Sequence, residues 1–353
     1  MTYHTLVENW SAITLSANDS FLASLNLITT CGYQLALVVK EDGKLAGMVT
    51  DSDIRKALLK GVNLDDSVCK VMNSSPVVVS PDTKQAEAFQ LMLFNHFFHL
   101  PIVNADGILV GLHVAPQLQS LQVIYEPLVI MAGGLGKRLM PLTQNVPKPM
   151  LPINEKPILQ HIIESAKIEG FTNIVISVNY LAEQIIDFFG NGSAFDLSID
   201  YLHENSPLGT AGALANLPSR FNDQNVVVTN ADLISKARFN DLLRYLKAEL
   251  CDGVMAVRTM EWKNPFGVVV SKGNELLGLD EKPTYRHQVN AGMYVLSPAI
   301  RKLLVLDSYC DMPDLFTRAL QAGLNLRVFP LHEDWLDIGR PEEYQAACRM
   351  NVN

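Results

Sequence analysis

A glycine-rich segment with nearby cations is the part of this sequence best suited to hold phosphate groups. Residues 131–143 read MAGGLGKRLMPLT, and PKPM follows at 147–150. Their three glycines and three cations are Gly133, Gly134, Gly136, Lys137, Arg138 and Lys148. Glycines let backbone N–H groups approach phosphate oxygens because no Cβ stands in the way. The spacing matches neither a P-loop nor GxGxxG, so the glycines alone do not name the ligand.

An acidic residue at the end of an apolar run is suited to hold a metal ion. The run 226–229 reads VVVT, and Asn230, Ala231 and Asp232 follow it. Ligands of open parallel sheets bind at the carboxyl ends of the strands. Mg²⁺ prefers oxygen ligands and keeps phosphates and water in its remaining positions. We therefore expect Asp232 to bind Mg²⁺, with a helix N-cap as the alternative role.

Small residues at 207–214, which read PLGTAGAL, would let backbone groups lie flat against a nucleobase. Glu204 stands just upstream. Guanine presents two N–H donors along one edge, and a carboxylate is a plausible acceptor for them. A solvated loop charge is an equally good interpretation of Glu204.

These segments together resemble the signature of the sugar-1-phosphate nucleotidyltransferases, also called NDP-sugar pyrophosphorylases. The resemblance spans about residues 127–350 and rests on GGxGxRLxPLT with PKPM, Asn-Ala-Asp at 230–232, EKP at 281–283, NAG at 290–292, and WLDIGRP at 335–341 with Tyr344. It implies that a sugar phosphate oxygen attacks the α-phosphorus of an NTP and that pyrophosphate leaves. Because negative charge grows on the phosphates, such a site needs placed cations more than an acid or a base.

The resemblance assigns a role to each of these residues. Arg138 would hold the β- and γ-phosphates, Lys148 would polarise the α-phosphate, and Asp337 would join Asp232 as the second metal ligand. The other assigned residues would line the base pocket (Gly209, Thr210, Gly212), contact the sugar (Glu281, Asn290, Gly292) or bind its phosphate (Lys282). Taken alone, Glu281 and Lys282 would be read as an exposed turn.

The N-terminal third contains an internal repeat with a constant offset. The stretch 37–49 returns as 101–114, and Gly43 recurs as Gly107 (107 − 43 = 64). Each copy reads as a strand, an Asp-Gly turn and a second strand. The elements predicted upstream are a strand at 12–15 and a helix at 19–31, then a strand at 76–79 and a helix at 83–96. We expect the two copies to share a core, because one alone is small.

This repeat resembles a tandem pair of CBS domains, an α+β regulatory module. Residues 47–54 match the family's Gly-x-hydrophobic-Thr-x-x-Asp pattern, in which Thr50 and Asp53 would contact the ribose and phosphate of an adenine nucleotide. The second copy, at 111–116, has neither residue, so the resemblance supports at most one nucleotide site in the module. Alternatively, Thr50 and Asp53 only cap the helix that starts at Ile54.

Beyond Pro127 the pattern changes to apolar runs at 128–131, 174–178 and 226–229, with helical stretches at 158–169 and 182–189 between them. This alternation predicts an α/β fold with helices on both faces of the sheet. The resemblance implies a Rossmann-like, GT-A-like mixed sheet. We expect a CBS module over 1–120 and a nucleotidyltransferase domain over 127–353.

Composition and charge limit the classes of partner that the protein is expected to bind. The formal net charge of the 353 residues is −9, and no basic stripe is visible, which argues against a nucleic-acid or membrane-surface partner. The N-terminus lacks the pattern of a signal peptide, and no apolar run approaches the roughly 18 residues of a membrane span. The five dispersed cysteines are typical of free thiols, so we expect a cytoplasmic protein.

The substrates are predicted from resemblance alone. The form LGTAGAL is more similar to the guanylyltransferase branch, which favours GTP. Transferases that carry an N-terminal CBS pair resemble bacterial guanylyltransferases of nonulosonic (legionaminic) acid synthesis, whose sugar is glucosamine 1-phosphate. Mannose-1-phosphate guanylyl transfer and hexosamine-1-phosphate uridylyl transfer are the alternatives. A non-catalytic nucleotide-sugar sensor is the alternative of another class, and a homo-oligomer, dimer or tetramer, is expected.

Overall fold

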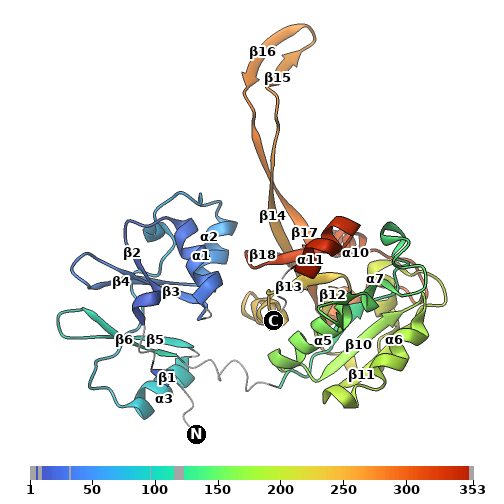
Figure 1. Ribbon diagram of the computed structural model, residues 1–353, viewed down its shortest axis with the longest axis horizontal. Coiled ribbons are helices and arrows are strands. Elements are labelled where there is room, and N and C mark those ends of the chain that lie inside the picture. The colour runs from blue at the N-terminus through green and yellow to red at the C-terminus, as the bar shows by residue number, and fades with distance from the viewer. Residues whose placement is uncertain (1–4, 7–9, 32, 96, 115–122, 350–353) are drawn as a thin grey trace. The chain divides into compact units, whose positions relative to one another are not determined.

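The computed structural model shows two compact units (Figure 1). The residues that it describes are 5–6, 10–31, 33–95, 97–114 and 123–349. The first unit holds the residues up to Tyr125 together with Lys167–Thr172, and the second holds Glu126–Ala166 and the residues from Asn173 on. The predicted end of the CBS module at residue 120 lies outside the described residues, so that boundary remains a prediction.

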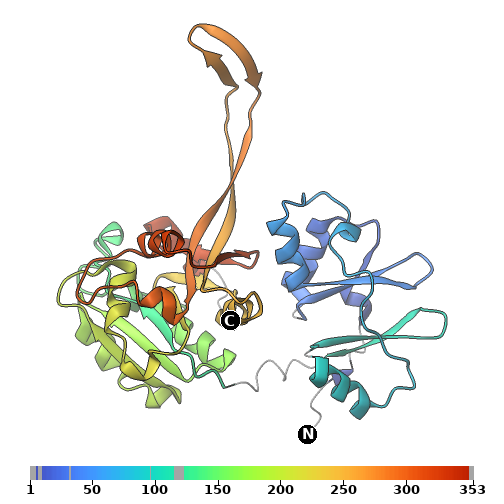
Figure 2. The same cartoon turned by 180° about the vertical axis from the view of Figure 1, so that it is seen from behind.

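The first unit contains two three-stranded sheets, one for each copy of the repeat (Figure 2). The first copy folds as η1(Trp10–Ile13), β2(Thr14–Ser16), α1(Phe21–Cys31), β3(Leu35–Val39), β4(Leu45–Thr50) and α2(Asp51–Leu59). The second copy folds as η2(Val68–Lys70), α3(Gln85–Asn95), β5(His99–Val103) and β6(Leu109–Val114), with β1(Thr5–Leu6) paired to β6. The predicted helices at 19–31 and 83–96 are confirmed as α1 and α3.

The predicted strand at 76–79 was wrong, because only Val79 makes a bridge, to Ile102. Pro76 has no N–H to donate, and Val77 and Val78 are exposed.

The offset of the repeat is visible in hydrogen bonds between the two Asp-Gly turns. Leu109 N–H donates to Gly43 O at 3.1 Å, and Leu45 N–H donates to Gly107 O at 3.1 Å. These pairs are related by the same shift (109 − 45 = 64). Gly43 and Gly107 have φ of 78° and 79°, as a tight hairpin turn requires. The two copies therefore face each other across an approximate two-fold axis.

The two copies also share a core. Leu35 and Leu37 of β3 pack with Leu109 and Leu112 of β6, and all four are almost fully buried. A separate cluster on the other side of the first copy packs α1 and α2 against the sheet. Since the apolar side chains between the two sheets are buried only when both copies are present, neither copy is expected to fold alone.

A seven-stranded mixed sheet forms the centre of the second unit, in the order β11-β10-β7-β12-β17-β14-β18. The first four strands are parallel, β17 is antiparallel to both of its neighbours, and β14 and β18 are parallel. Their bounds are β7(Leu128–Met131), β10(Asn173–Val178), β11(Ser198–His203), β12(Val226–Asn230), β14(Gly253–Lys263), β17(Thr284–Leu296) and β18(Leu326–Leu331).

Helices cover both faces of this sheet, as the alternation predicted. Leu128, Val129 and Ile130 are successive residues of β7, so they point to opposite faces, and all are fully buried. Val129 belongs to a cluster that includes Leu315 and Phe316 of α10. The helices of this unit are α5(Ile158–Glu169), α6(Ala182–Phe189), α7(Gly209–Gly212), α8(Phe239–Ala248), α9(Pro298–Arg301), α10(Met312–Gln321) and α11(Pro341–Arg349). The helices predicted at 158–169 and 182–189 are α5 and α6.

Several short elements complete the unit. They are η3(Lys137–Leu139), η4(Lys148–Met150), β8(Pro152–Ile153), β9(Lys156–Pro157), η5(Ser193–Phe195), η6(Ala213–Asn216), η7(Ser219–Phe221), β13(Leu233–Ser235) and β19(Trp335–Asp337). Among the helices that the structure describes, none has the length and apolar character needed to span a bilayer.

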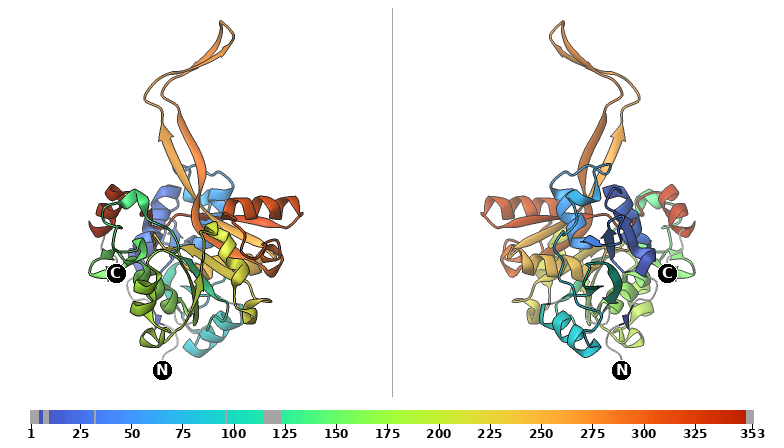
Figure 3. Two further views of the ribbon diagram at one scale, coloured as in Figure 1. Left: turned by 90° about the vertical axis from the view of Figure 1, so that its right-hand side faces the viewer. Right: turned by 90° about the vertical axis from the view of Figure 1, so that its left-hand side faces the viewer.

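The strands β14 and β17 continue past the sheet as a two-stranded ribbon that projects away from the rest of the unit (Figure 3). We call residues 259–288 the arm. Its stem pairs 259–263 with 284–288, and its outer end is the hairpin of β15(Val268–Lys272) and β16(Glu275–Asp280). β14 still pairs with β18 as far as Arg258, so the stem begins directly after the sheet ends, and a bulge between Met255 and Val257 lies within the sheet part of β14.

Candidate active site

The strand order brings the glycine segment and Asp232 to the same edge of the sheet. β7 lies between β10 and β12, and the chain turns from one side of β7 to the other. Residues 132–136 follow β7, and Asp232 follows β12. Because these strands are parallel neighbours, both segments lie at their carboxyl ends, at the topological switch point where α/β sheets bind ligands.

Lys148 contacts Asp232 directly. Its Nζ donates a hydrogen bond to Asp232 Oδ2, and the two side chains are only 11% and 22% exposed. Lys148 is the first residue of η4 and directly follows Pro147. Two residues that the sequence separates by a whole β-α-β stretch therefore form a largely buried ion pair. A buried pair of this kind keeps a cation and a carboxylate in fixed positions where phosphates would enter.

Asp337 reaches the same place through a small two-stranded sheet. β13 follows Asp232 and pairs antiparallel with β19, so that Leu233 lies opposite Asp337. Ile338 N–H also donates to Asp232 O at 3.0 Å. Trp335 Nε1–H donates to Ala291 O at 2.9 Å and thereby fixes the start of β19 on β17. The structure thus brings the two predicted metal carboxylates together.

The electrostatics of this pair fit a cation. Asp232 Oδ1 and Asp337 Oδ1 are buried and accept no hydrogen bond from any residue that the structure describes. Burial raises the pKa of the Asp337 carboxyl, and the neighbouring Asp232 carboxylate raises it further. Buried carboxylate oxygens without donors are costly, and a divalent cation prefers such hard oxygen ligands. The residues present therefore fit a divalent metal ion held by Asp232 and Asp337.

Arg138 and Glu343 complete this group. A Cβ placed on Gly339 would lie 3.3 Å from Arg138 Nη1 and 3.2 Å from Glu343 Oε2. Arg138 and Lys148 both act to lower the pKa of Asp337, whereas Glu343 raises it. Glu343 also accepts a hydrogen bond from Gly339 N–H at 2.7 Å. Sequence reasoning missed Glu343, although it lies beside Tyr344 of the same motif.

The predicted phosphate-binding glycines differ in their surroundings. A Cβ on Gly133 would lie 2.5 Å from Glu204 Oε1, so a larger residue here would displace the Glu204 carboxylate from its present position. Gly136 has φ of 61°, and its carbonyl accepts from the Thr143 hydroxyl at 2.8 Å. Gly134 has nothing within 4 Å of a Cβ position. The backbone at Gly134 is therefore the open part of the segment.

The Glu204 carboxylate accepts hydrogen bonds from within the chain, which neither the guanine-acceptor nor the solvated-charge interpretation predicted. Ser177 Oγ donates to its Oε1 at 2.6 Å, and Leu208 N–H donates to its Oε2 at 2.8 Å. The carboxylate thus ties the loop before α7 to β10. It is not a solvated loop charge. Its role toward guanine remains a prediction.

The small residues at 209–212 pack against the start of α10. A Cβ on Gly209 would lie 2.6 Å from Cys310 O, and one on Gly212 would lie 2.5 Å from Ser308 O. Asp311 Oδ1 accepts from Thr210 N–H at 3.0 Å and from the Thr210 hydroxyl at 3.2 Å. Close packing within the chain therefore already requires small residues here. The contact with a nucleobase that the resemblance assigns to them remains a prediction.

Asn290 and Gly292 lie where β17 meets the strand ends. Gly292 has φ of 73°, and its N–H donates to Asn290 Oδ1 at 3.0 Å. A Cβ on Gly292 would lie 2.7 Å from Asn230 Nδ2. Asn230 Oδ1 is buried without a partner among the described residues, so its amide is a polar group of the site that received no role from the sequence.

Glu281 and Lys282 are not brought to this group. They lie on the arm between β16 and the start of β17, and their side chains are 77% and 57% exposed. Lys282 is eight residues from Asn290 along an extended strand, which corresponds to roughly 26 Å at about 3.3 Å per residue. The structure therefore assembles Arg138, Lys148, Asp232 and Asp337, and leaves Lys282 apart from them.

In the first unit, Thr50 and Asp53 form a helix cap. The Thr50 N–H and hydroxyl both donate to Asp53 Oδ2, at 2.9 and 2.7 Å, and α2 begins at Asp51, three residues before the predicted start at Ile54. This is the capping-box arrangement. The alternative interpretation as a cap is confirmed, and the nucleotide role of the two residues remains a prediction.

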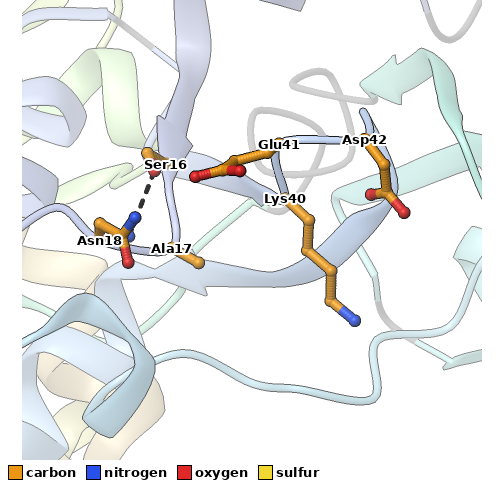
Figure 4. Close-up of a pocket in the computed structure, with 6 residues that line it drawn as sticks. All are labelled: Ser16, Ala17, Asn18, Lys40, Glu41 and Asp42. Carbon is orange, nitrogen blue, oxygen red and sulfur yellow. Dashed lines mark hydrogen bonds between the residues drawn. The ribbon is translucent and has the colours of Figure 1, made fainter.

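An open pocket of about 390 Å³ lies at the other end of the same sheet (Figure 4). It is lined by Ser16, Ala17, Asn18, Lys40, Glu41 and Asp42, which follow β2 and β3. Thr50 pairs with Leu35, at the start of β3, so the cap and the pocket are at opposite ends of the sheet. With two carboxylates and one lysine, this pocket has no excess of cations for phosphate groups.

Residues 128–351 match the family model described as nucleotidyl transferase, and the chain belongs to this family. Residues 8–60 and 68–112 match the CBS domain, so the repeat is a tandem pair of CBS domains.

Curated relatives match the second unit. A mannose-1-phosphate guanyltransferase of Hypocrea jecorina is 34% identical over 225 residues, which are 61% of each chain. The mannose-1-phosphate guanyltransferase beta-A of Xenopus laevis is 32% identical over 229 residues, 63% of each chain. This chain thus spans about three fifths of the length of these relatives. A solved structure, "Putative Glucose-1-Phosphate Thymidylyltransferase from Bacillus anthracis", is 22% identical with a TM-score of 0.53, covers 64% of this chain and 94% of its own, and supports the fold.

Proposed function

We propose that the second unit transfers GMP from GTP to a sugar 1-phosphate with the help of Mg²⁺, giving a GDP-sugar and pyrophosphate. The observation that carries this proposal is the pair of buried carboxylates, Asp232 and Asp337, with Lys148 and Arg138 beside them at the switch point of the sheet. Membership of the nucleotidyl transferase family supports the reaction class.

The chemistry follows from these positions. An oxygen of the sugar phosphate forms a bond to the α-phosphorus of GTP, and the bond from that phosphorus to the bridging oxygen of the leaving pyrophosphate breaks. Pyrophosphate takes the electron pair, so no proton needs to move. Mg²⁺ held by Asp232 and Asp337 would supply positive charge to the phosphate oxygens. Lys148 stabilises charge on the α-phosphate, and Arg138 does so on the β- and γ-phosphates.

Nucleotide and sugar are inferred separately. GTP is favoured by the form LGTAGAL and by the relatives, whose names state guanylyl transfer. Glucosamine 1-phosphate is the sugar that the CBS-bearing resemblance favours. The names of the relatives favour mannose 1-phosphate as the alternative. Lys282 and Glu281 would act on the sugar phosphate and hydroxyls only after the arm has carried them to a site.

Pyrophosphate release tests the proposal. GTP, UTP, dTTP, CTP and ATP are each combined with glucosamine, N-acetylglucosamine and mannose 1-phosphates in the presence of Mg²⁺. We expect GTP with glucosamine 1-phosphate to exceed the other pairs. GTP with mannose 1-phosphate in first place would keep the guanylyl transfer and correct the sugar. No release from folded protein that still binds GTP would favour a non-catalytic nucleotide-sugar sensor.

A matched pair of variants ties the activity to the site. Asp337→Asn removes a proposed metal ligand, whereas Asp334→Asn changes an exposed carboxylate three residues away that pairs with Lys236. We expect the first variant to lose activity and the second to keep it. Equal loss in both would mean that the segment matters only for folding.

The adenine-nucleotide site of the CBS pair is proposed on the match to that domain and on Thr50 and Asp53. Calorimetric titration of AMP or ATP into the full chain and into Asp53→Asn checks it. Binding that survives Asp53→Asn unchanged would move the site elsewhere, the pocket beside Lys40 being the first place to look.

A further inference from the structure

Lys148 lies between the glycine segment and the two carboxylates of the candidate active site. Its stem borders the glycine segment, since a Cβ placed on Gly136 would lie 3.2 Å from Lys148 Cβ. Its Nζ contacts Asp232 Oδ2, and the Lys148 side chain is only 11% exposed. Burial and the Asp232 carboxylate raise the pKa of Asp337, and the Lys148 charge partly offsets this rise. One ammonium group therefore lies beside both proposed metal ligands and next to the segment expected to hold phosphates.

The two carboxylates are anchored through their backbone, whereas the ammonium group ends a flexible side chain. Ile338 N–H donates to Asp232 O at 3.0 Å, and Asp337 belongs to the ladder of β13 and β19. Leu151 N–H donates to Lys148 O at 3.1 Å and holds the lysine backbone in place. A lysine side chain carries a compact charge on a flexible four-carbon stem, so it can change partners by rotation of its own bonds. Lys148 Nζ is thus the charge of this group that can move while the backbone stays fixed.

Lys148 and a divalent ion would need the same carboxylate. Asp232 Oδ1 and Asp337 Oδ1 are buried and accept no hydrogen bond within the described part of the chain, so the lysine alone does not satisfy the two carboxylates. Two cations side by side in a largely buried site repel each other strongly. A buried carboxylate that loses its cation without a replacement is also costly. Lys148 is therefore expected to leave Asp232 only when another cation takes its place and another anion receives the ammonium group.

We propose that Lys148 and the metal ion compete for Asp232, and that Lys148 moves to a phosphate oxygen of the nucleotide when the ion binds. This inference rests on the proposed function. A metal ion alone binds weakly, because it displaces Lys148 while no phosphate is present to receive it. The nucleotide removes this penalty, and since coupling between two ligands is reciprocal, the ion strengthens nucleotide binding by the same factor. Lys148 thereby links the entry of the metal ion to the entry of the nucleotide.

Binding of Mn²⁺ to the full chain without nucleotide tests the competition and requires no turnover. Free Mn²⁺ is measured by its electron paramagnetic resonance signal during a titration. Lys148→Met removes the charge and keeps most of the stem, whereas the control Lys236→Met removes a lysine that is 62% exposed and pairs with Asp334. We expect Lys148→Met to bind Mn²⁺ at least about 10-fold more tightly than the wild type, within the usual size of coupling between two bound groups. Lys236→Met should equal the wild type.

A double variant separates this inference from the proposed function. Lys148→Met combined with Asp337→Asn lacks a proposed metal ligand and should lose the affinity gained by Lys148→Met alone. Binding of Mn²⁺ that depends on Asp337 but is not strengthened by Lys148→Met would overturn the competition and leave the proposed metal site intact. Absence of binding in Lys148→Met, or binding that does not depend on Asp337, would overturn both.

A measurement on the unaltered chain keeps the test decisive if circular dichroism shows that Lys148→Met does not fold. Reductive methylation followed by mass spectrometry reports how accessible each lysine amine is. Mg²⁺ without nucleotide should raise the labelling of Lys148, because the ion displaces its amine from Asp232, and should leave the labelling of Lys236 unchanged. Equal labelling of Lys148 with and without saturating Mg²⁺ would overturn the proposal.

Discussion

The strand-end site and the arm belong to the same unit and share the strand β17, yet their residues are held in opposite ways. At the strand ends, Lys148, Asp232 and Asp337 come from three distant segments and are fixed by ladders, a buried ion pair and the Trp335 hydrogen bond. On the arm, Glu281 and Lys282 are neighbours in the sequence and are exposed. The difference teaches that residues from one set of family motifs can be packed together at strand ends or left exposed on a projecting ribbon.

The largest effect is expected at the ion pair. Lys148→Ala removes the cation that pairs with Asp232 and should lower kcat about 10³-fold, in the range found when one stabilising group of a transition state is removed. Steady-state pyrophosphate release measures it. Lys236→Ala, an exposed lysine in a surface ion pair, is the control and should keep full activity. A loss below tenfold would mean that the strand-end site is not where phosphate chemistry occurs.

A backbone position gives the next largest effect. Gly292→Ala must accept φ of 73° and would place a Cβ 2.7 Å from Asn230 Nδ2, so we expect a loss of about 2 kcal/mol in the free energy of unfolding and about 100-fold in activity. Gly278→Ala on the arm meets no atom within 4 Å and should change stability by less than about 0.5 kcal/mol. Denaturant melts compare the two. Equal losses of stability in both variants would contradict the view that Gly292 is tightly packed while Gly278 is not.

Lys282→Ala tests whether the exposed lysine of the arm takes part in binding the sugar phosphate. If the arm delivers this lysine, the KM for the sugar phosphate should rise about 10- to 100-fold, while binding of GTP stays the same. Lys272→Ala, at the tip of the same hairpin, is the matched control and should behave as the wild type. An unchanged KM in Lys282→Ala would remove the arm from the reaction.

The smallest effect concerns stability without metal. The pKa of Asp337 is raised by burial and by Asp232, so the folded state holds its proton at a higher pH than the unfolded chain does. In metal-free protein, the free energy of unfolding should therefore decline as pH rises from the ordinary range of aspartate through the raised pKa of Asp337, and level off above it. Asp337→Asn should be about 1 kcal/mol more stable than the wild type at neutral pH, although it is inactive.

The control for this prediction is Glu281→Gln on the arm, whose exposed carboxylate should give no change in stability. Thermal melts in a chelator measure both variants. A destabilised Asp337→Asn would show that the carboxylate is satisfied by the fold and does not wait for a cation.

Much of the fold was predictable because its signals are local. The run 128–131 is a strand, and 158–169 and 182–189 are helices with the predicted bounds, since each is a continuous apolar or amphipathic segment. The strand predicted at 76–79 failed because its ladder depends on a partner, and only Val79 finds one. The arm was not predicted, because an apolar run such as 268–270 reads the same whether a second layer covers it or not.

The positions of Lys148, Asp232 and Asp337 in one group were predictable from the motifs that contain them, and their roles in the reaction remain predictions. The site was not predictable where a side chain binds groups that only the fold brings close to it. The partners of Glu204 are the Ser177 hydroxyl and the Leu208 N–H, and no spacing rule connects a loop carboxylate with a strand 27 residues earlier. Glu343 acts through its distance to Asp337 and Gly339, which only the folded chain sets.

The two Asp-Gly turns of the first unit hold each other in place, since each supplies the carbonyl that continues the strand of the other. This reciprocity couples the lengths of the two turns. A residue inserted in one turn would shift its glycine out of reach and leave both copies with an unpaired strand end, so neither copy can change its turn length alone. The two copies differ around these turns, since only the first has Thr50 and Asp53, yet their glycines are separated by the same 64 residues as the rest of the repeat (107 − 43 = 64).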